Sequence, residues 1–137
     1  MKAISLYNGY RLIVWTLAVL FALGGSTALA GNDSSINGEL RQAIQARMVS
    51  HIEGHTVEDT YFLFDAAEGK LLALKFKQLH KGIVRKGAFY VSCADFVDQE
   101  GRLVDLDFLV IPQGAGLLTA QAIVHAVDGQ KRKYHLE

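Results

Sequence analysis

The sequence has 137 residues, half of them hydrophobic, and its 14 basic side chains balance 14 acidic ones. This balance gives no electrostatic case for binding to nucleic acid or to an acidic membrane surface, because both need a basic stripe, and neither partner is expected. There is one cysteine, Cys93, and an internal disulfide is therefore excluded. The fold must be stabilised by its hydrophobic core.

The first 30 residues have the order of a secretory signal peptide. Lys2 and Arg11 precede an apolar run that ends at Leu23, and Ala28 and Ala30 are the small residues of a cleavage site. We expect cleavage after Ala30, which makes the protein periplasmic or secreted. The alternative is a retained membrane anchor, but a spanning helix needs about 20 apolar residues and this run is shorter. Contact with a membrane is expected only through the leader before cleavage.

A helix is predicted directly after the leader. Residues 31–35 are polar and turn-prone and predict a flexible N-terminus, and a single domain is expected over residues 36–137. Apolar side chains recur every four residues from the start of that domain, which is typical of a helix that packs on one face. They are Ile36, Leu40, Ile44, Met48 and Ile52, and Gly54 is placed to end the helix.

From Thr60 onward the apolar residues alternate with polar ones, which predicts antiparallel strands covered on one face. Three turn sequences that begin with Asp and contain Gly, at 65–70, 98–102 and 128–131, each lie between two alternating runs and predict three hairpins. A link bracketed by Gly82 and Gly87 and another at 112–116 would join the hairpins. The six predicted strands lie within residues 61–64, 72–76, 89–93, 104–110, 118–126 and 134–136.

The predicted fold class is therefore α+β, with one N-terminal helix packed on a meander antiparallel sheet of about six strands. This outline resembles cystatin-like and NTF2-like folds in architecture, with no shared motif to support the resemblance. The helix is expected to cover a face built from Leu74, Phe76, Leu106, Phe108, Ala122 and Val124.

The opposite face of the sheet is expected to be open and polar, and it is the predicted working surface. Besides the residues of the binding site named next, its polar side chains are Lys75, Lys77, Ser92 and Lys133. We predict a binding site on this face formed by Tyr90, Asp105, Asp107, Gln121, His125 and His135. A solvated polar face without a binding role is the simpler interpretation of the same pattern, and a homodimer that covers this face is a further one.

A metal site is the alternative use of the same face. His125 and His135 lie on the strands of the last hairpin, and Asp105 or Asp107 on the neighbouring strand would complete a set of ligands or an acid–base cluster. A divalent metal ion is thus the one cofactor that the sequence allows for, and none other is expected.

Two further features have a functional and a structural interpretation. His51 and His55 have the spacing of a helical metal pair, but the expected helix ends at Gly54, and a histidine next to a helix cap explains them equally well. Cys93 could be a nucleophile with a histidine as base. Its place in an apolar strand beside Phe89 and Val91 favours an inert, buried residue on the helix side of the sheet.

The sequence predicts an exported binding or accessory module of the bacterial envelope, whose partner would be a protein or a small ligand. The alternative is a periplasmic metal-binding protein that uses His125, His135 and an aspartate. A small hydrolase-type enzyme comes third, because the sequence contains no CxxC pair, no GxSxG motif and no phosphate-binding loop.

Overall fold

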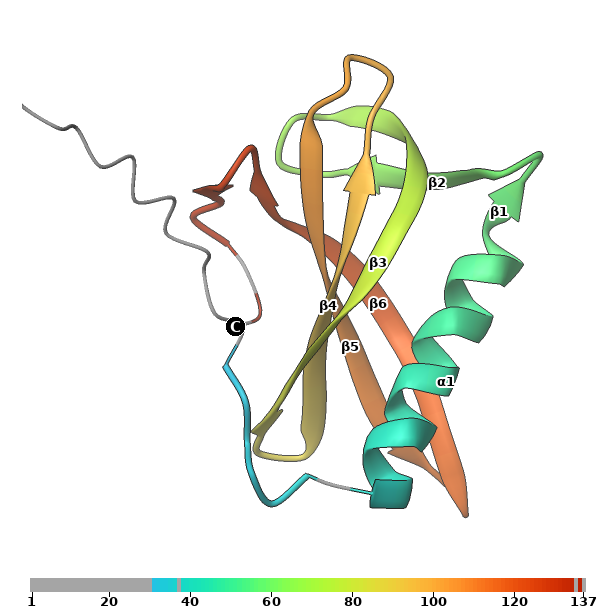
Figure 1. Ribbon diagram of the computed structural model, residues 1–137, viewed down its shortest axis with the longest axis vertical. Coiled ribbons are helices and arrows are strands. Elements are labelled where there is room, and N and C mark those ends of the chain that lie inside the picture. The colour runs from blue at the N-terminus through green and yellow to red at the C-terminus, as the bar shows by residue number, and fades with distance from the viewer. Residues whose placement is uncertain (1–30, 37, 135, 137) are drawn as a thin grey trace, which may run out of the picture.

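The structure is a computed structural model that describes residues 31–36, 38–134 and 136. The predicted signal peptide and His135 lie outside the described residues. The fold is α+β, with one helix and one antiparallel sheet of seven strands (Figure 1). No helix in the described part of the chain is long and apolar enough to cross a membrane.

The helix α1 spans Gly38–Gly54 and ends where the sequence predicted. Its stripe of apolar residues is buried at Ile44, Met48 and Ile52, whereas Leu40 is 37% exposed. Glu39 lies in the first turn and His51 in the last, which are the positions where the helix dipole favours an acidic and a basic side chain. One face of α1 therefore packs on the sheet, as its four-residue period requires.

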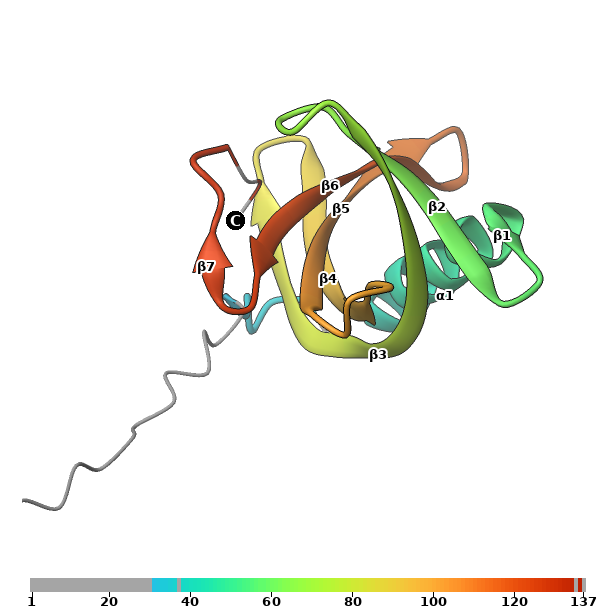
Figure 2. The ribbon, with the colours of Figure 1, turned by 90° about the horizontal axis from the view of Figure 1, so that it is seen from above.

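The sheet is a meander in which every strand pairs with its neighbours in the chain. The strands are β1 (Thr56–Val57), β2 (Thr60–Asp65), β3 (Lys70–Lys86), β4 (Phe89–Val97), β5 (Leu103–Gln113), β6 (Gly116–Val127) and β7 (Gln130–Lys131). The sheet is strongly curled, so that β2 comes into contact with β6 although the two strands do not pair (Figure 2). Helix α1 and the last strand of the sheet, β7, lie at opposite ends of the molecule in the view of Figure 2.

The count of about six strands and the position of the first link were wrong. Two strands of only two residues, β1 and β7, are too short to show an alternating pattern. The link expected from Gly82 to Gly87 is not a loop, because β3 continues through Gly82 and turns only at Gly87, whose φ of 59° favours glycine. The predicted strand at 134–136 is not formed by the described residues there.

The three turns that begin with aspartate were predicted correctly. Asp65 Oδ1 accepts a hydrogen bond from the backbone N of Ala67 at 3.0 Å, and Asp98 Oδ1 accepts one from Glu100 N at the same distance. The turn between β6 and β7 has Asp128 and Gly129 at positive φ, which fits a tight two-residue hairpin. Local side-chain chemistry thus fixes the ends of the strands.

The hydrophobic core lies between α1 and the inner, concave face of the sheet. Five of the six residues predicted to face the helix are buried there, and they are Leu74, Leu106, Phe108, Ala122 and Val124. Phe76 is the exception, because its side chain is 46% exposed although its ring contacts that of Phe96 edge-on. We call the opposite side of the sheet the outer face.

The two faces of β4 are reversed relative to the prediction. Tyr90 pairs with Val110 of β5 and joins the core, and only 7% of it is exposed. Val91 and Cys93 point to the outer face instead. Residues on both faces of β4 are buried. The alternation of apolar and polar residues in this strand therefore does not predict which face packs against the helix.

Candidate metal centre

Two histidines reach the outer face through irregularities in the strands that flank the β4–β5 pair. On β3, residues 80–82 lie opposite the single residue Cys93, because Leu79 pairs with Ala94 and Ile83 with Ser92. On β6, the partners of Asp105 and Leu106 are Ala126 and Val124, so His125 is an extra residue between them. Bulges of this kind redirect side chains, and here they direct His80 and His125 toward the same strand pair.

Five side chains with metal-ligating atoms come together around Cys93. Cys93 and Asp107 are paired across β4 and β5, and Asp105 is two residues before Asp107. We call these three residues, with His80 and His125, the Cys93 cluster. It contains two groups of three whose ligand atoms all lie within 4.8 Å of one another: His80, Cys93 and Asp105, and Cys93, Asp107 and His125. Cys93 belongs to both groups.

The second of these groups is completely buried and tightly packed. Asp107 Oδ1 lies 2.8 Å from His125 Nδ1 and accepts a hydrogen bond from the Cys93 thiol at 3.0 Å. The distance from Cys93 Sγ to His125 Nδ1 is 3.9 Å. None of the three side chains is more than 2% exposed. A thiol, an imidazole and a carboxylate thus converge in a space that solvent does not reach.

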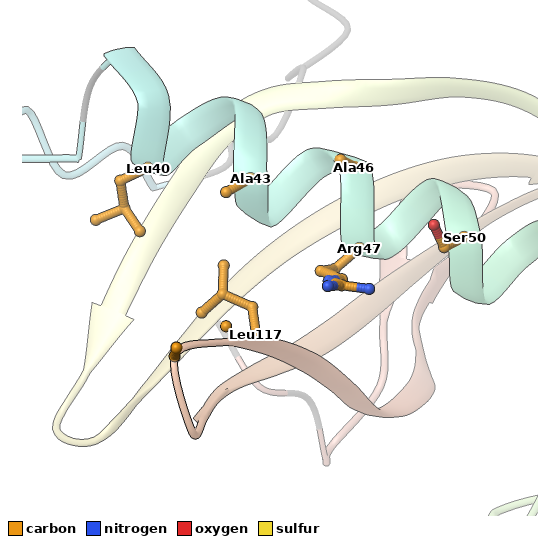
Figure 3. A pocket seen from close by; sticks show the side chains of 8 residues that line it. Leu40, Ala43, Ala46, Arg47, Ser50 and Leu117 are labelled. Carbon is orange, nitrogen blue, oxygen red and sulfur yellow. The ribbon is translucent and has the colours of Figure 1, made fainter.

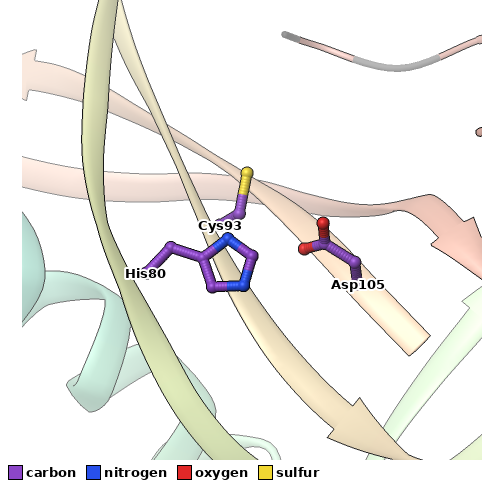
Figure 4. Close-up of side chains that lie close together, drawn as sticks. All are labelled: His80, Cys93 and Asp105. Atoms are coloured by element: carbon purple, nitrogen blue, oxygen red, sulfur yellow. The ribbon is translucent and has the colours of Figure 1, made fainter. Parts of the chain in front are cut away.

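The first group lies on the β3 side of Cys93, and Figure 4 shows how His80 and Asp105 project toward the cysteine from its two neighbouring strands. His80 Nε2 lies 3.0 Å from Asp95 Oδ1. The other oxygen of Asp95 accepts a hydrogen bond from Gln78 Nε2 at 2.7 Å. The ring of His80 is therefore held by a carboxylate that is itself held in place.

The C-terminal segment packs on the outer face beside Asp107 and His125. The backbone N of Leu136 donates to Asp107 Oδ2 at 2.6 Å, and Arg132 N donates to the carbonyl of His125 at 2.7 Å. The Arg132 side chain forms an ion pair with Asp65 at 3.0 Å, which connects the C-terminal segment to the end of β2. The prediction that Asp107 and His125 lie on an open surface was therefore wrong.

The charges of Asp107 and His125 support each other. Burial alone would raise the pKa of Asp107, but hydrogen bonds from His125, Cys93 and Leu136 outweigh it and hold that pKa below its ordinary value. The hydrogen bond to Asp107 raises the pKa of His125 above 6.5. Asp107 is thus an anion in the folded protein, and it attracts positive charge to its position.

Asp105 is the carboxylate of the cluster that lacks compensation. Burial raises its pKa from 3.8 to about 6, although His80 and His125 act in the opposite direction. Its Oδ1 atom is buried and has no hydrogen-bond partner among the described residues, and its Oδ2 atom lies 4.0 Å from His125 Nδ1. A buried carboxylate oxygen without a donor is costly unless a cation or a proton accompanies it.

The residues of the predicted binding site are thus divided by the structure. Asp105, Asp107 and His125 come together, as the predicted metal site requires. Gln121 is exposed on the same face and pairs with Leu109, outside the cluster, and Tyr90 is in the core. Cys93 and His80 were missed as partners, because the register of β4 and the bulge in β3 leave no local signal in the sequence.

The pair His51 and His55 does not form such a centre. Their rings stack with centroids 4.1 Å apart, and His55 Nδ1 lies 2.8 Å from the carbonyl oxygen of His51. Among the residues that the structure describes, neither histidine belongs to a group of three converging ligand atoms. Burial lowers the pKa of His51, which fits a histidine at the edge of the core. These contacts fit the interpretation of His51 and His55 as histidines next to a helix cap.

The geometry of Cys93 also differs from that of a catalytic triad. In a triad the acid and the nucleophile contact different nitrogens of the histidine ring. Cys93 and Asp107 both approach the same atom, Nδ1 of His125, and only 1% of Cys93 is exposed. Among the residues that the structure describes, the sulfur is therefore buried and the three groups converge on one point instead of forming a relay.

A shallow groove lies on the other side of the molecule, between α1 and the turn that joins β5 to β6 (Figure 3). It has a volume of about 490 Å³ and is lined mainly by small or apolar residues, with Arg47 as its charged group. The small side chains of Ala43, Ala46 and Ser50 leave this space open. No group of metal-ligating or nucleophilic side chains adjoins it among the described residues.

Comparison with protein-family models, with curated proteins and with solved structures finds no match to this chain, and the architectural resemblance to cystatin-like and NTF2-like folds stays a prediction.

Proposed function

We propose that this protein is an exported zinc-binding protein, in which Cys93, Asp107 and His125 hold the ion. The observation that supports the proposal is the convergence of a thiol, a carboxylate and an imidazole nitrogen at separations of 2.8 to 3.9 Å in a fully buried position. The donor set keeps the histidine and the aspartate of the metal site predicted from the sequence, and Cys93 takes the place of His135.

The separations suit the proposed ion. Zinc is bound at about 2.3 Å by sulfur and at about 2.0–2.2 Å by nitrogen and oxygen, so neighbouring ligands of a tetrahedral ion are about 3.3–3.6 Å apart. Movements of about 0.6 Å would bring each pair of the three atoms to such a separation. Sulfur, nitrogen and oxygen donors together are typical of zinc, whereas calcium and magnesium prefer oxygen alone.

The ion would replace two protons. In the metal-free state the Cys93 thiol and Nδ1 of His125 both direct a hydrogen at Asp107 Oδ1. A zinc ion bound in their place contacts all three atoms and keeps the Asp107 charge compensated in the buried site. The Leu136 amide, which donates to the other oxygen of Asp107, can stay in place and orient the carboxylate.

The test is the metal content and zinc affinity of the untagged, purified protein. We expect at least one zinc ion per chain by elemental analysis, and a sulfur-to-metal charge-transfer absorption when cobalt replaces zinc. His125→Gln and Asp107→Asn should each lower the affinity by about 10-fold or more, as loss of a ligand or its support does. Circular dichroism verifies that both variants fold.

A matched control uses the other histidine site. His55 is exposed and lies outside the Cys93 cluster, so His55→Ala should bind zinc as the unmodified protein does. If the folded protein takes up no zinc, or if His55→Ala and His125→Gln weaken binding equally, the proposal is wrong.

A further inference from the structure

We infer that the protein holds a second divalent ion between His80, Cys93 and Asp105, and that the Cys93 thiolate bridges it to the ion bound by Asp107 and His125. The inference rests on the proposed function, because the two ions share one sulfur. Its geometric basis is that Cys93 lies in two separate groups of converging ligand atoms.

The two groups approach Cys93 from opposite directions. His80 comes from β3, on one side of the β4–β5 pair, and His125 comes from β6 on the other. Asp105 completes the group of His80 and Asp107 that of His125, and Asp105 Oδ2 also lies 4.0 Å from His125 Nδ1. Cys93 lies between them, and a thiolate sulfur has enough lone pairs to bind two ions at once.

His80 has the supporting contact that metal-binding histidines usually have. A histidine ligand almost always donates its second ring N–H to a carboxylate or carbonyl, which fixes the ring and makes the other nitrogen a better donor. His80 makes this contact through Nε2 to Asp95, and Gln78 holds Asp95 in turn. Nδ1 is then the nitrogen that is left for an ion.

The balance of charge also favours two ions. Once the first ion has displaced the Cys93 proton, the thiolate, Asp105 and Asp107 make three neighbouring negative charges. One divalent ion leaves negative charge in a buried site, where it is costly. A second ion would supply the partner that the buried Oδ1 atom of Asp105 lacks among the described residues.

Cobalt titration of the purified, metal-free protein tests the inference. We expect the thiolate absorption to saturate at two ions per chain in the unmodified protein and at one ion in His80→Ala. Because a shared sulfur couples the spins of two cobalt ions, the electron paramagnetic resonance signal per cobalt should fall when the second ion binds. His55→Ala is the control, and it should keep both ions and the coupling.

The outcomes separate this inference from the proposed function. If the protein binds one ion that His80→Ala also binds, the zinc site stands and the second position is wrong. Two ions without spin coupling, or two ions in His80→Ala, also overturn it. If no cobalt binds with a thiolate absorption, both proposals fail. Two ions in the unmodified protein, coupled, and one in the folded His80→Ala variant support it.

Discussion

Cys93 and Asp107 are paired residues on β4 and β5, and the thiol of one donates to the carboxylate of the other at 3.0 Å. Two adjacent anions in a buried site repel each other, so a thiolate at this position needs a cation that compensates both charges. The same contact therefore stabilises the metal-free protein and makes metal binding dependent on pH.

Zinc affinity should rise with pH. Binding displaces the proton of the Cys93 thiol and the Nδ1 proton of His125, whose pKa is raised above 6.5 by Asp107. A ligand that releases protons binds more tightly as pH increases, so the increase should continue above pH 6.5. Competition with a chromogenic chelator across this range measures it, and a flat profile contradicts the proposed ligands.

Asp105 should lower the stability of the metal-free protein at neutral pH. Its pKa is raised from 3.8 to about 6 by burial, so the folded state binds more protons than the unfolded state in this window and loses stability as pH rises through it. Asp105→Asn should remove this loss. Relative to the unmodified protein, the variant should gain about 1–2 kcal/mol more in free energy of unfolding at pH 7 than at pH 4, allowing for partial exposure. Urea unfolding with chelator present measures the difference.

The thiol of Cys93 should be unreactive in the folded protein. Because only 1% of it is exposed, a bulky thiol reagent can reach the sulfur only when the structure opens. The control is a double variant in which Cys93 is replaced by Ser and Gln121 by Cys. Its one thiol is exposed on the same face and should react at once. Labelling of native Cys93 at a similar rate would mean that the cluster is not buried.

Tyr90 should matter for stability. The sequence placed Tyr90 on an open binding face, but its side chain lies in the core, and the Arg85 guanidinium lies over its ring at 5.6 Å from the centroid. Tyr90→Ala should cost about 3 kcal/mol or more, as truncation of a buried aromatic residue does. Thermal unfolding measures this, and Tyr134→Ala, at a residue 71% exposed, is the control.

Phe108 tests the assignment of the inner face. It is fully buried and its ring contacts that of His51 edge-on at 5.9 Å between centroids. Phe108→Ala should lower the free energy of unfolding by about 3–5 kcal/mol. Leu118→Ala, at a residue 40% exposed on the next strand, should cost far less. Equal costs in chemical denaturation would show that the faces are assigned wrongly.

Local patterns in the sequence were enough to predict the helix, the hairpin turns and most of the core. Side-chain period and turn chemistry act over a few residues, so they are visible in one chain. The Cys93 cluster depends instead on which residues of neighbouring strands are paired. The partner of Cys93 is 14 residues away and that of His80 is 15 residues away, and bulges shift both histidines out of the simple alternation.

Because His125 is an extra residue in a bulge, the chain can lose this ligand without a change in the pairing of its strands. Deletion of this one residue would restore regular pairing at this point of β5 and β6, because Ala126 and Val124 already oppose consecutive residues of β5. A chain shortened in this way would keep its hairpins and core, and the Cys93 cluster would lose one of its two imidazoles. Insertion or loss of single residues in the strands on either side of β4–β5 is thus a route by which a protein of this architecture can gain or lose a ligand of the proposed metal centre without refolding.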